Sequence, residues 1–520
     1  MRLDSSAFSL APWDSTLPPP ESKRRRRRGR SGPKYSVSRH AVTRRREAGP
    51  LRPWRSRVKI AVVRPHIARR AAAAALLAWG LVTPGCRHAG QRPNLLLIVI
   101  DTLRADHLGC YGYRLDTSPA IDRFAEGAVL FEQAVAQAPW TRPSMATLMT
   151  GLYPATHGVT CKDFDVPKAE CDVLPPSVTT LAEALKQAGY ETAGIVANIQ
   201  IDGLFGFGQG FDEYRSVFDE LIAADPDWRA KWHEFKWVNE TTREVTEEAL
   251  AWLERRRGEN PFFLYLHYLD PHAPYRPPAP YDAMFKAHAY PCRYPAICAE
   301  LPLYDGEIRY VDEHVGRLLD FMRRRGLAEK TVVVVTSDHG EAFGEHGARD
   351  RRHGLSLYEN QLRVPLLIRA PGTGRPGTRV AAPVRLVDLA PTLLDVLGVA
   401  VPSGVQGLSL VPLLRGEAVE VPGTLVGWGY VPLIGFRNPP WKFIRNQRSG
   451  LEELYNLETD PGETYNLASA LPQVAMALAA TLDRSLSSAV AAARRYPHER
   501  GAVELSPAQR EGLRALGYAN

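Results

Sequence analysis

Three runs of apolar residues constrain what this chain can fold into more than any other feature of its sequence. They cover residues 94–102, 261–267 and 331–337. A strand with apolar residues on both faces must be covered on both faces, which is typical of a parallel sheet between helices. Asp101, His267 and Asp338 stand at the ends of these runs. Open α/β sheets bind ligands at the C-terminal ends of their strands, so we expect a functional site there.

Segments with helical periodicity alternate with these strands. Helices are predicted over residues 117–131, 180–189, 239–257 and 303–325, and a further strand over 191–197. This alternation favours an α/β fold with a mostly parallel sheet. A chain of 520 residues is long enough for one large domain and a smaller second one.

The segment 139–151 has the features of a helix start that carries hydroxyl groups. Thr141 and Ser144 can both cap a helix, and Pro143 suits its first turn. The N-terminus of a helix favours negative charge, so a hydroxyl there is well placed to attack an anionic ester. An ordinary capped helix without a chemical role is the alternative interpretation.

Polar residues that follow the buried strands form a metal-ligand pattern. Asp101, Asp338 and His339, together with the Thr141 hydroxyl, would hold one divalent cation and leave a position open. Carboxylate and hydroxyl oxygens suit Ca²⁺, Mg²⁺ or Mn²⁺, whereas the imidazole favours Zn²⁺ or Mn²⁺. A cation beside Thr141 would activate its hydroxyl and neutralise the oxygens of an ester.

The net charge of +8 is concentrated at one end of the chain. Residues 1–70 contain 20 Lys and Arg against 4 Asp and Glu, a net charge of +16, which leaves −8 for the remainder. The basic character therefore belongs to a tail, and we expect no nucleic-acid binding by the folded part. We expect residues 1–68 to be disordered, or not to be translated at all.

Residues 69–92 resemble an export signal followed by a linker. A pair of arginines precedes a short apolar run, 71–82, and small residues follow it. This order is typical of a secretory signal, and the run is too short to span a membrane comfortably. Gly85 and Cys86 resemble the end of a lipoprotein signal, which predicts an exported protein of the cell envelope, periplasmic or on the outer surface, with a lipid anchor at Cys86. Cleavage nearby and a retained anchor are the alternatives.

The use of cysteine agrees with export. Cys161 and Cys171, and likewise Cys292 and Cys298, are close enough in sequence to close small loops. Disulfides are expected in an oxidising compartment, and four unpaired thiols are the alternative.

Five short motifs occur in order between residues 93 and 470. They lie at residues 94–106, 141–151, 337–341, 358–365 and 454–463. The first resembles the opening of sulfatase-family proteins in the alkaline phosphatase superfamily, the second their nucleophile signature and the third their second metal motif. The fourth and fifth resemble the segment after that motif and the family's C-terminal motif. By this resemblance the chain is identified as a member of the family.

The resemblance implies a three-layer αβα core with a mostly parallel sheet over residues 93–400. It also implies a small α+β subdomain on a short antiparallel sheet, followed by a helical tail, over residues 401–520. Four positions match metal ligands, and one of them, Thr141, also matches the nucleophile. These ligand positions are Asp101, Thr141, Asp338 and His339. Three histidines lie near positions that bind the substrate's anionic group or protonate its leaving group. They are His157, His272 and His353.

Departures from the sulfatase pattern bear on the chemistry. Sulfatases place Cys or Ser at the nucleophile position, for oxidation to formylglycine, and an Arg four residues later. Here the residues are Thr141 and Met145, so Thr141 would attack directly. Such a Thr resembles the nucleophile of phosphodiesterases, phosphonate hydrolases and lipid-headgroup transferases. The Lys-rich segment that sulfatases often carry before a Gly-Phe-Asp stretch is absent, because residues 197–202 contain no lysine, and this removes a cation that would bind an anionic ester. Phosphate or phosphonate ester chemistry is therefore at least as well supported as sulfate chemistry.

Three functions remain open on this basis. The first is a metal-dependent hydrolase of anionic esters, with a glycan or a lipid headgroup as substrate and His272 or His353 as the acid. The second is an envelope transferase that passes a phosphate-linked headgroup from Thr141 to an acceptor. The third is a surface binding protein that uses the same fold without catalysis.

Overall fold

The computed structural model describes residues 92–160, 169–170, 173–218, 241–497, 502–503, 505–507 and 509–510. The predicted basic tail, the predicted signal up to residue 91 with Cys86, and the Cys161–Cys171 pair lie outside the described residues. Among the helices that the structure describes, none has both the length and the apolar character needed to cross a membrane.

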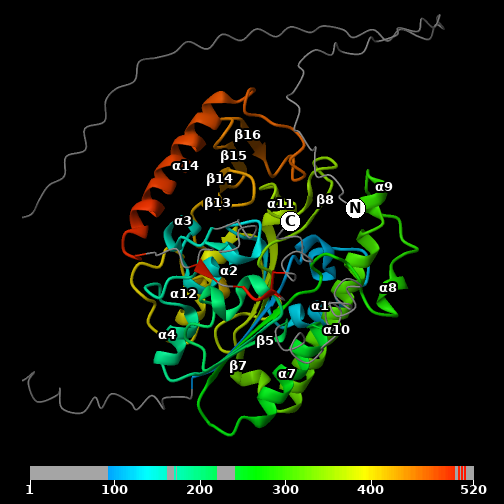
Figure 1. Ribbon diagram of the computed structural model, residues 1–520, viewed down its shortest axis with the longest axis vertical. Helices are drawn as coiled ribbons and strands as arrows, with labels where there is room; N and C mark the ends of the chain where they lie inside the picture. Colours follow the sequence, from blue (N-terminus) through cyan, green and yellow to red (C-terminus); the bar gives the residue numbers. More distant parts are fainter. Residues whose placement is uncertain are drawn as a thin grey trace, which may run out of the picture. The chain divides into compact units, whose positions relative to one another are not determined.

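A nine-stranded sheet forms the centre of the described part (Figure 1). Its strands are β1 (Asn94–Ile100), β2 (Val129–Val135), β4 (Glu191–Val196), β5 (Glu213–Ser216), β6 (Phe262–Tyr268), β7 (Thr331–Thr336), β10 (Arg363–Arg369), β11 (Arg379–Val380) and β12 (Val384–Arg385). Eight of them follow the order β11-β2-β10-β7-β1-β6-β4-β5, and β12 pairs with β2. Neighbours from β7 to β5 are parallel, whereas β10 is antiparallel to β7 and β2.

Strand β1 lies between β6 and β7, and this register determines where the functional side chains meet. Val99 of β1 pairs with His267 of β6 on one side and with Thr336 of β7 on the other. Every residue of β6 and β7 is buried, as the apolar runs predict. The side chains that follow β1 and β7 therefore leave the sheet side by side at its C-terminal edge.

Helices cover both faces of the sheet. One group is centred on α10 (Leu301–Arg324), which contacts α1 (Pro119–Glu126), α7 (Thr241–Arg255), α8 (Tyr281–Met284) and α9 (Pro295–Cys298). The second group contains α2 (Thr141–Thr150), α3 (Pro154–His157), α4 (Leu181–Gln187), α12 (Leu389–Val396) and α13 (Val411–Leu414). Figure 1 shows α4 and α12 on the opposite side of the strands from α1, α7 and α10. The predicted three-layer α/β class is confirmed.

One predicted helix is wrong in its second half. Residues 117–131 were expected to be helical, but α1 ends at Glu126 and β2 begins at Val129. Gly127 ends the helix, and the apolar residues that follow pair with β10 in the sheet. The apolar spacing of a helix and of a buried strand is similar over so short a stretch, so tertiary pairing decided the structure here.

A separate four-stranded antiparallel sheet forms the C-terminal part, as the family resemblance implied. Its strands are β13 (Thr424–Gly427), β14 (Leu433–Asn438), β15 (Trp441–Asn446) and β16 (Glu452–Asn456). The long helix α14 (Pro472–Ala493) contacts the first three of them. The remaining elements are the β8–β9 hairpin (Ala342–Phe343 and Arg351–Arg352), the short helix α11 (Glu359–Leu362) and the β3–β17 pair (Ala169–Glu170 and Ala502–Val503). The boundary at residues 400 and 401 stays a prediction.

The second predicted cysteine pair is confirmed. Cys292 and Cys298 form a disulfide with a Cα–Cα distance of 5.5 Å. Cys110, which was not assigned a partner, has a free thiol.

A buried ion network joins the C-terminal sheet to the core. Glu359 of α11 pairs with Arg437 of β14 and Lys442 of β15, at 3.0 Å each. Lys442 also pairs with Glu463 at 2.8 Å, and its side chain is fully buried. Glu463 in turn accepts a hydrogen bond from the backbone N–H of Glu359. Since isolated buried charges are costly, each member of this network depends on its partners.

We expect Lys442→Ala to lower the free energy of unfolding by about 3–5 kcal/mol, because it leaves two carboxylates without their shared cation. Urea unfolding measures this change. Arg445→Ala on the same strand is the matched control, since Arg445 pairs with Glu452 and Asp483 near the surface. Its cost should stay below about 1 kcal/mol. An equal loss of unfolding free energy in the two variants would show that burial does not determine how much the network stabilises the protein.

Candidate active site

Thr141 is the first residue of helix α2, directly in front of the C-terminal edge of the sheet. The predicted capping role is wrong for both hydroxyls, because the residue at the N-cap position is Trp140. The Ser144 hydroxyl instead donates to the backbone carbonyl of Asp338 at 2.5 Å. The Thr141 hydroxyl faces His339, with 3.3 Å between Oγ1 and Nε2. Both side chains thus connect the helix to the end of β7 instead of to its own backbone.

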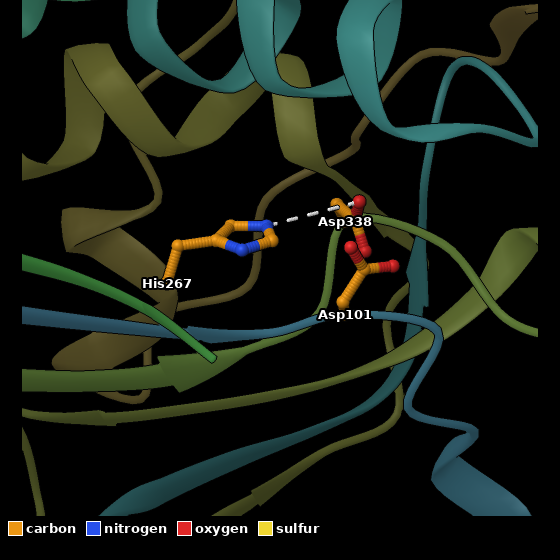
Figure 2. Close-up of side chains that lie close together, drawn as sticks. All are labelled: Asp101, His267 and Asp338. Carbon is orange, nitrogen blue, oxygen red and sulfur yellow. Dashed lines mark ion pairs between the residues drawn. The ribbon is translucent and has the colours of Figure 1, made fainter. Parts of the chain in front are cut away.

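Two carboxylates and an imidazole converge below this helix. Asp101 follows β1, Asp338 follows β7, and His267 lies in β6 (Figure 2). Each offers a ligand atom within 4.8 Å of the other two, and all three are buried. The His267 ring points toward Asp338, with 4.0 Å between Nε2 and Oδ2. His267 was noted at a strand end in the sequence but was not assigned to the metal site.

His339 completes the cluster from the side of the nucleophile. Its Nδ1 lies 2.9 Å from the backbone carbonyl of Gly340, so Nδ1 carries the proton and Nε2 presents a lone pair. Nε2 lies 3.4 Å from Asp338 Oδ2 and 3.8 Å from Asp101 Oδ1. All four predicted ligands, Asp101, Thr141, Asp338 and His339, therefore meet at one place.

The two carboxylates differ in their electrostatic surroundings. Burial and the neighbouring charge of Asp338 raise the pKa of Asp101 well above its ordinary value. Burial acts in the same direction on Asp338, but His339 and His267 outweigh it and lower the pKa of that carboxyl. Burial also lowers the pKa of His267 to about 4, so this ring is neutral near pH 7 and able to act as a ligand.

The unsatisfied atoms of the cluster fit a divalent cation. Among the described residues, Asp101 Oδ1, Asp338 Oδ2 and both ring nitrogens of His267 are buried without a hydrogen-bond partner. Buried polar atoms are normally paired, so several converging unpaired ligand atoms indicate a bound group. Two carboxylate oxygens with imidazole nitrogen suit Zn²⁺ or Mn²⁺, and the oxygens also suit Mg²⁺ or Ca²⁺.

Two of the predicted substrate-side histidines lie next to this cluster. The rings of His272 and His353 have centroids 5.0 Å apart, and His353 lies 4.6 Å from the ring of His339. His272 Nδ1 donates to the carbonyl of Ala273 at 2.6 Å. His353 Nδ1 lies 3.2 Å from Glu341 Oε1. Burial lowers the pKa of His272 to about 3 and that of His353 to about 4, so both rings are neutral near pH 7.

The third predicted histidine lies further along the helix. His157 Nε2 is 3.1 Å from the Thr147 hydroxyl, and its Nδ1 accepts from the backbone N–H of Val159 at 3.1 Å. Thr147 is six residues, or about 9 Å of helix, beyond Thr141. These contacts connect α2 to α3, and a role of His157 in substrate binding stays a prediction.

Two further residues of the site were missed by sequence reasoning. Asn198, which follows β4, contacts both Asp101 and Thr141. Tyr430, between β13 and β14, packs its ring against Trp140 with centroids 5.3 Å apart. The only sequence signal for Asn198 was its place in the segment that lacks the family's lysine. Tyr430 had none, because it lies far along the chain from every other site residue.

Comparison with known proteins agrees with this geometry. Residues 93–399 match the family model described as Sulfatase, which covers more than half of the chain. The chain belongs to the sulfatase family. Residues 344–490 also match the model described as N-sulphoglucosamine sulphohydrolase, C-terminal. The family predicted from the five motifs is thus confirmed, and the chain is a sulfatase-family ester hydrolase.

Alignments with individual relatives cover most of the chain. The ulvan-active sulfatase of Formosa agariphila is 29% identical over 406 residues, which cover 72% of this chain and 77% of that protein. The choline-sulfatase of Rhizobium meliloti is 25% identical over 438 residues, 72% of this chain and 82% of that protein. Among solved structures, a phosphonate monoester hydrolase of Agrobacterium radiobacter has a TM-score of 0.63 at 22% identity, covering 76% of this chain and 96% of its own. This last likeness shows the shared fold.

We expect Asp101→Asn to stabilise this sulfatase-family chain in the presence of a chelator, by about 0.5–2 kcal/mol. The substitution removes one of two like charges that are buried within 4.8 Å of each other. Ca²⁺, Mg²⁺, Mn²⁺ and Zn²⁺ are then added separately. With the cation that binds, the wild type should become more stable than Asp101→Asn, because only the wild type gains binding free energy. Thermal melts with and without each cation measure both effects.

Asp388→Asn is the control for this experiment. Asp388 is equally buried but is paired with Arg385, so its substitution should destabilise the chain with or without metal. Destabilisation by Asp101→Asn in chelator, or no stabilisation of the wild type by any of the four cations, would contradict the assignment of a metal site.

Proposed function

We propose that this enzyme cleaves anionic esters by direct attack of the Thr141 hydroxyl, assisted by one divalent metal ion. The observation that carries the proposal is the position of Thr141 Oγ1, 3.3 Å from His339 Nε2, which itself lies 3.4 Å from Asp338 Oδ2 and 3.8 Å from Asp101 Oδ1. Thr141 cannot be converted to formylglycine in the way that Cys or Ser can. Direct nucleophilic attack requires an activated hydroxyl, and a metal ion held by these neighbouring side chains would activate Thr141.

The metal would be held by Asp101, Thr141, Asp338 and His339, with His267 as the neighbouring imidazole. When bound, it would neutralise the oxygens of the ester and favour the ionised form of the attacking hydroxyl. Ca²⁺, Mg²⁺, Mn²⁺ and Zn²⁺ all remain candidates for this position.

The reaction has two steps. In the first, the Thr141 hydroxyl gives up its proton to solvent, Thr141 Oγ1 forms a bond to the sulfur or phosphorus atom, and the bond from that atom to the leaving oxygen breaks. The leaving oxygen takes one proton, and the anionic group stays on Thr141 as an ester. In the second, a water molecule attacks the same sulfur or phosphorus atom, the bond from that atom to Thr141 Oγ1 breaks, and a proton from the water restores the Thr141 hydroxyl.

We assign the proton donor to His272 or His353. Both rings are neutral in the free protein because burial lowers the pKa of each, so the donor must take up its proton together with the anionic substrate. Glu341, 3.2 Å from His353 Nδ1, would stabilise that ring once it is charged. His157 is proposed to contact the substrate from the α2–α3 corner.

The relatives support a sulfated glycan as one substrate class. They include an ulvan-active sulfatase and an N-acetylglucosamine-6-O-sulfatase. The Thr nucleophile supports phosphodiesters and phosphonate monoesters, because a phosphoryl centre readily accepts two-step displacement by a hydroxyl. We further propose that the protein is exported to the cell envelope and carries a lipid anchor at Cys86.

A panel of aryl esters tests the proposal. We expect the metal-loaded wild type to turn over an aryl sulfate, an aryl phosphate, a bis-aryl phosphate or an aryl phosphonate monoester. Thr141→Ala should lower kcat by a factor of about 10⁴ or more, because it removes the nucleophile, whereas Thr141→Ser should retain measurable turnover. Mass spectrometry of the quenched reaction should find the anionic group on the peptide that contains Thr141.

Thr150→Ala on the same helix is the control. The Thr150 hydroxyl donates to the Ala146 carbonyl, away from the metal cluster, so its loss should leave kcat unchanged. If Thr141→Ala is as active as Thr150→Ala on every ester of the panel, direct attack by Thr141 is excluded. Turnover of the aryl sulfate alone would restrict the chemistry to sulfate esters.

A further inference from the structure

Asn198 is placed where one side chain reaches both the first carboxylate and the nucleophile. It stands between the end of β4 and a short 3-10 helix at Ile199–Ile201, and it is fully buried. Its Oδ1 accepts a hydrogen bond from the backbone N–H of Gln200 at 2.8 Å. This contact fixes the orientation of the amide, because only the carbonyl end can accept from an N–H group. The Nδ2 end must therefore face the metal cluster.

Both hydrogens of that amide nitrogen have acceptors in the cluster. Asn198 Nδ2 lies 2.5 Å from Asp101 Oδ2 and 3.5 Å from Thr141 Oγ1. The bond to Asp101 occupies one carboxylate oxygen and leaves Oδ1, which has no partner among the described residues, for a cation. The contact to Thr141 directs an oxygen lone pair toward Asn198. Without a metal, the hydroxyl proton is then free to point toward His339 Nε2.

A hydrogen bond of this kind strengthens during the reaction. An N–H donor to a neutral hydroxyl is weak, but the same donor to an oxygen that is losing its proton becomes charge-assisted. A donor that is already in position gains this energy without rearrangement, which is how preorganised donors accelerate reactions. The amide is also neutral, so it leaves the negative charge of Asp101 uncompensated for the metal. A lysine in this segment would compete with the metal for that charge.

From this geometry we infer that Asn198 is a positioning residue that holds Asp101 and Thr141 in the arrangement needed for attack and supplies a hydrogen bond to the ionising Thr141 oxygen. The inference rests on the proposed function, because it takes Thr141 as the nucleophile.

Two substitutions of similar size separate positioning from folding. Asn198→Asp keeps the shape, removes the N–H donor and adds a carboxylate beside Asp101. We expect kcat to fall about 10²–10³-fold with little change in KM, while affinity for the metal stays equal or increases. Asn198→Leu removes both hydrogen bonds, so metal affinity should fall about 10–100-fold together with kcat.

Asn94 provides a matched control at the other end of the same strands. Its Nδ2 donates to the Thr331 hydroxyl at 3.3 Å, and its Oδ1 accepts from the N–H of Phe262 at 3.1 Å. Asn94→Leu should lower stability without changing metal affinity or kcat. If the Asn198 variants behave like Asn94→Leu while Thr141→Ala is inactive, the inference about Asn198 is wrong and the proposed nucleophile stands. If Thr141→Ala is fully active, the proposed function itself fails.

An independent observation concerns Tyr430 in the C-terminal part. Its hydroxyl is buried and has no hydrogen-bond partner in the described ranges. Burial raises the pKa of this hydroxyl. The ring is held between Trp140 and the backbone of Gly354, where a Cβ atom would come within 2.5 Å of it. Trp140 precedes the nucleophile, and Gly354 follows His353.

We propose that the Tyr430 hydroxyl donates a hydrogen bond to an oxygen of the bound ester, so that the C-terminal sheet contributes a substrate contact. A buried hydroxyl left unpaired is costly, and an anionic oxygen is the partner that this surrounding offers. The proposal rests on this buried hydroxyl, which has no hydrogen-bond partner among the described residues, and does not depend on Asn198.

Tyr430→Phe keeps the ring packing and removes only this hydroxyl. We expect KM for the turned-over ester to rise about tenfold or more, with a smaller change in kcat and an unchanged melting temperature. Tyr455→Phe is the control in the same sheet, because the Tyr455 hydroxyl bonds to Glu453. An unchanged KM for Tyr430→Phe would overturn the proposal. An equal rise of KM in both variants would also overturn it, because the effect would then come from the C-terminal sheet and not from the Tyr430 hydroxyl.

Discussion

The proximity of two buried carboxylates, Asp101 and Asp338, is the constraint on which the rest of the site depends. Adjacent parallel strands bring them together, and the cost of placing like charges in a buried site must be met by their surroundings. Each carboxylate has one oxygen satisfied: Asp338 Oδ1 accepts from the backbone N–H groups of Thr102 and His339, and Asp101 Oδ2 accepts from Asn198. The other oxygen of each points into the cluster without a partner among the described residues.

The backbone around Asp101 is adapted to this arrangement at a cost. Thr102 adopts a left-handed conformation with φ of 55°, which is unfavourable for a β-branched residue. This conformation directs its N–H toward Asp338, and its carbonyl accepts from the buried hydroxyl of Tyr304 at 2.8 Å. Strain of this kind persists only where the surrounding structure enforces it, and it is common at functional sites. The geometry of the carboxylate pair is therefore fixed by the fold before any metal binds.

Sequence reasoning predicted the members of the site that follow long buried strands and missed those on short connections. Asp101, Asp338 and His339 could be placed because a fully apolar run marks the strand before each of them. Asn198 follows a shorter strand, and its role depends on an amide orientation set by the next turn. Tyr430 could not be predicted at all, since only the packing of the C-terminal sheet brings it to Trp140. The same limit explains β2, where pairing with β10 overrode the expected helix.

The departures of this chain from the sulfatase nucleophile signature fit together physically. Met145 stands where sulfatases carry an arginine, and it is fully buried among apolar side chains of the core, where a guanidinium would lack solvation. Thr141, one helical turn earlier, faces neutral groups, namely the Asn198 amide and the lone pair of His339. In the proposed direct attack, a metal and the Asn198 donor would activate the Thr141 hydroxyl, and no formylglycine would form. A catalytic site that had merely decayed would have no reason to keep two unpaired carboxylate oxygens buried beneath an intact hydroxyl.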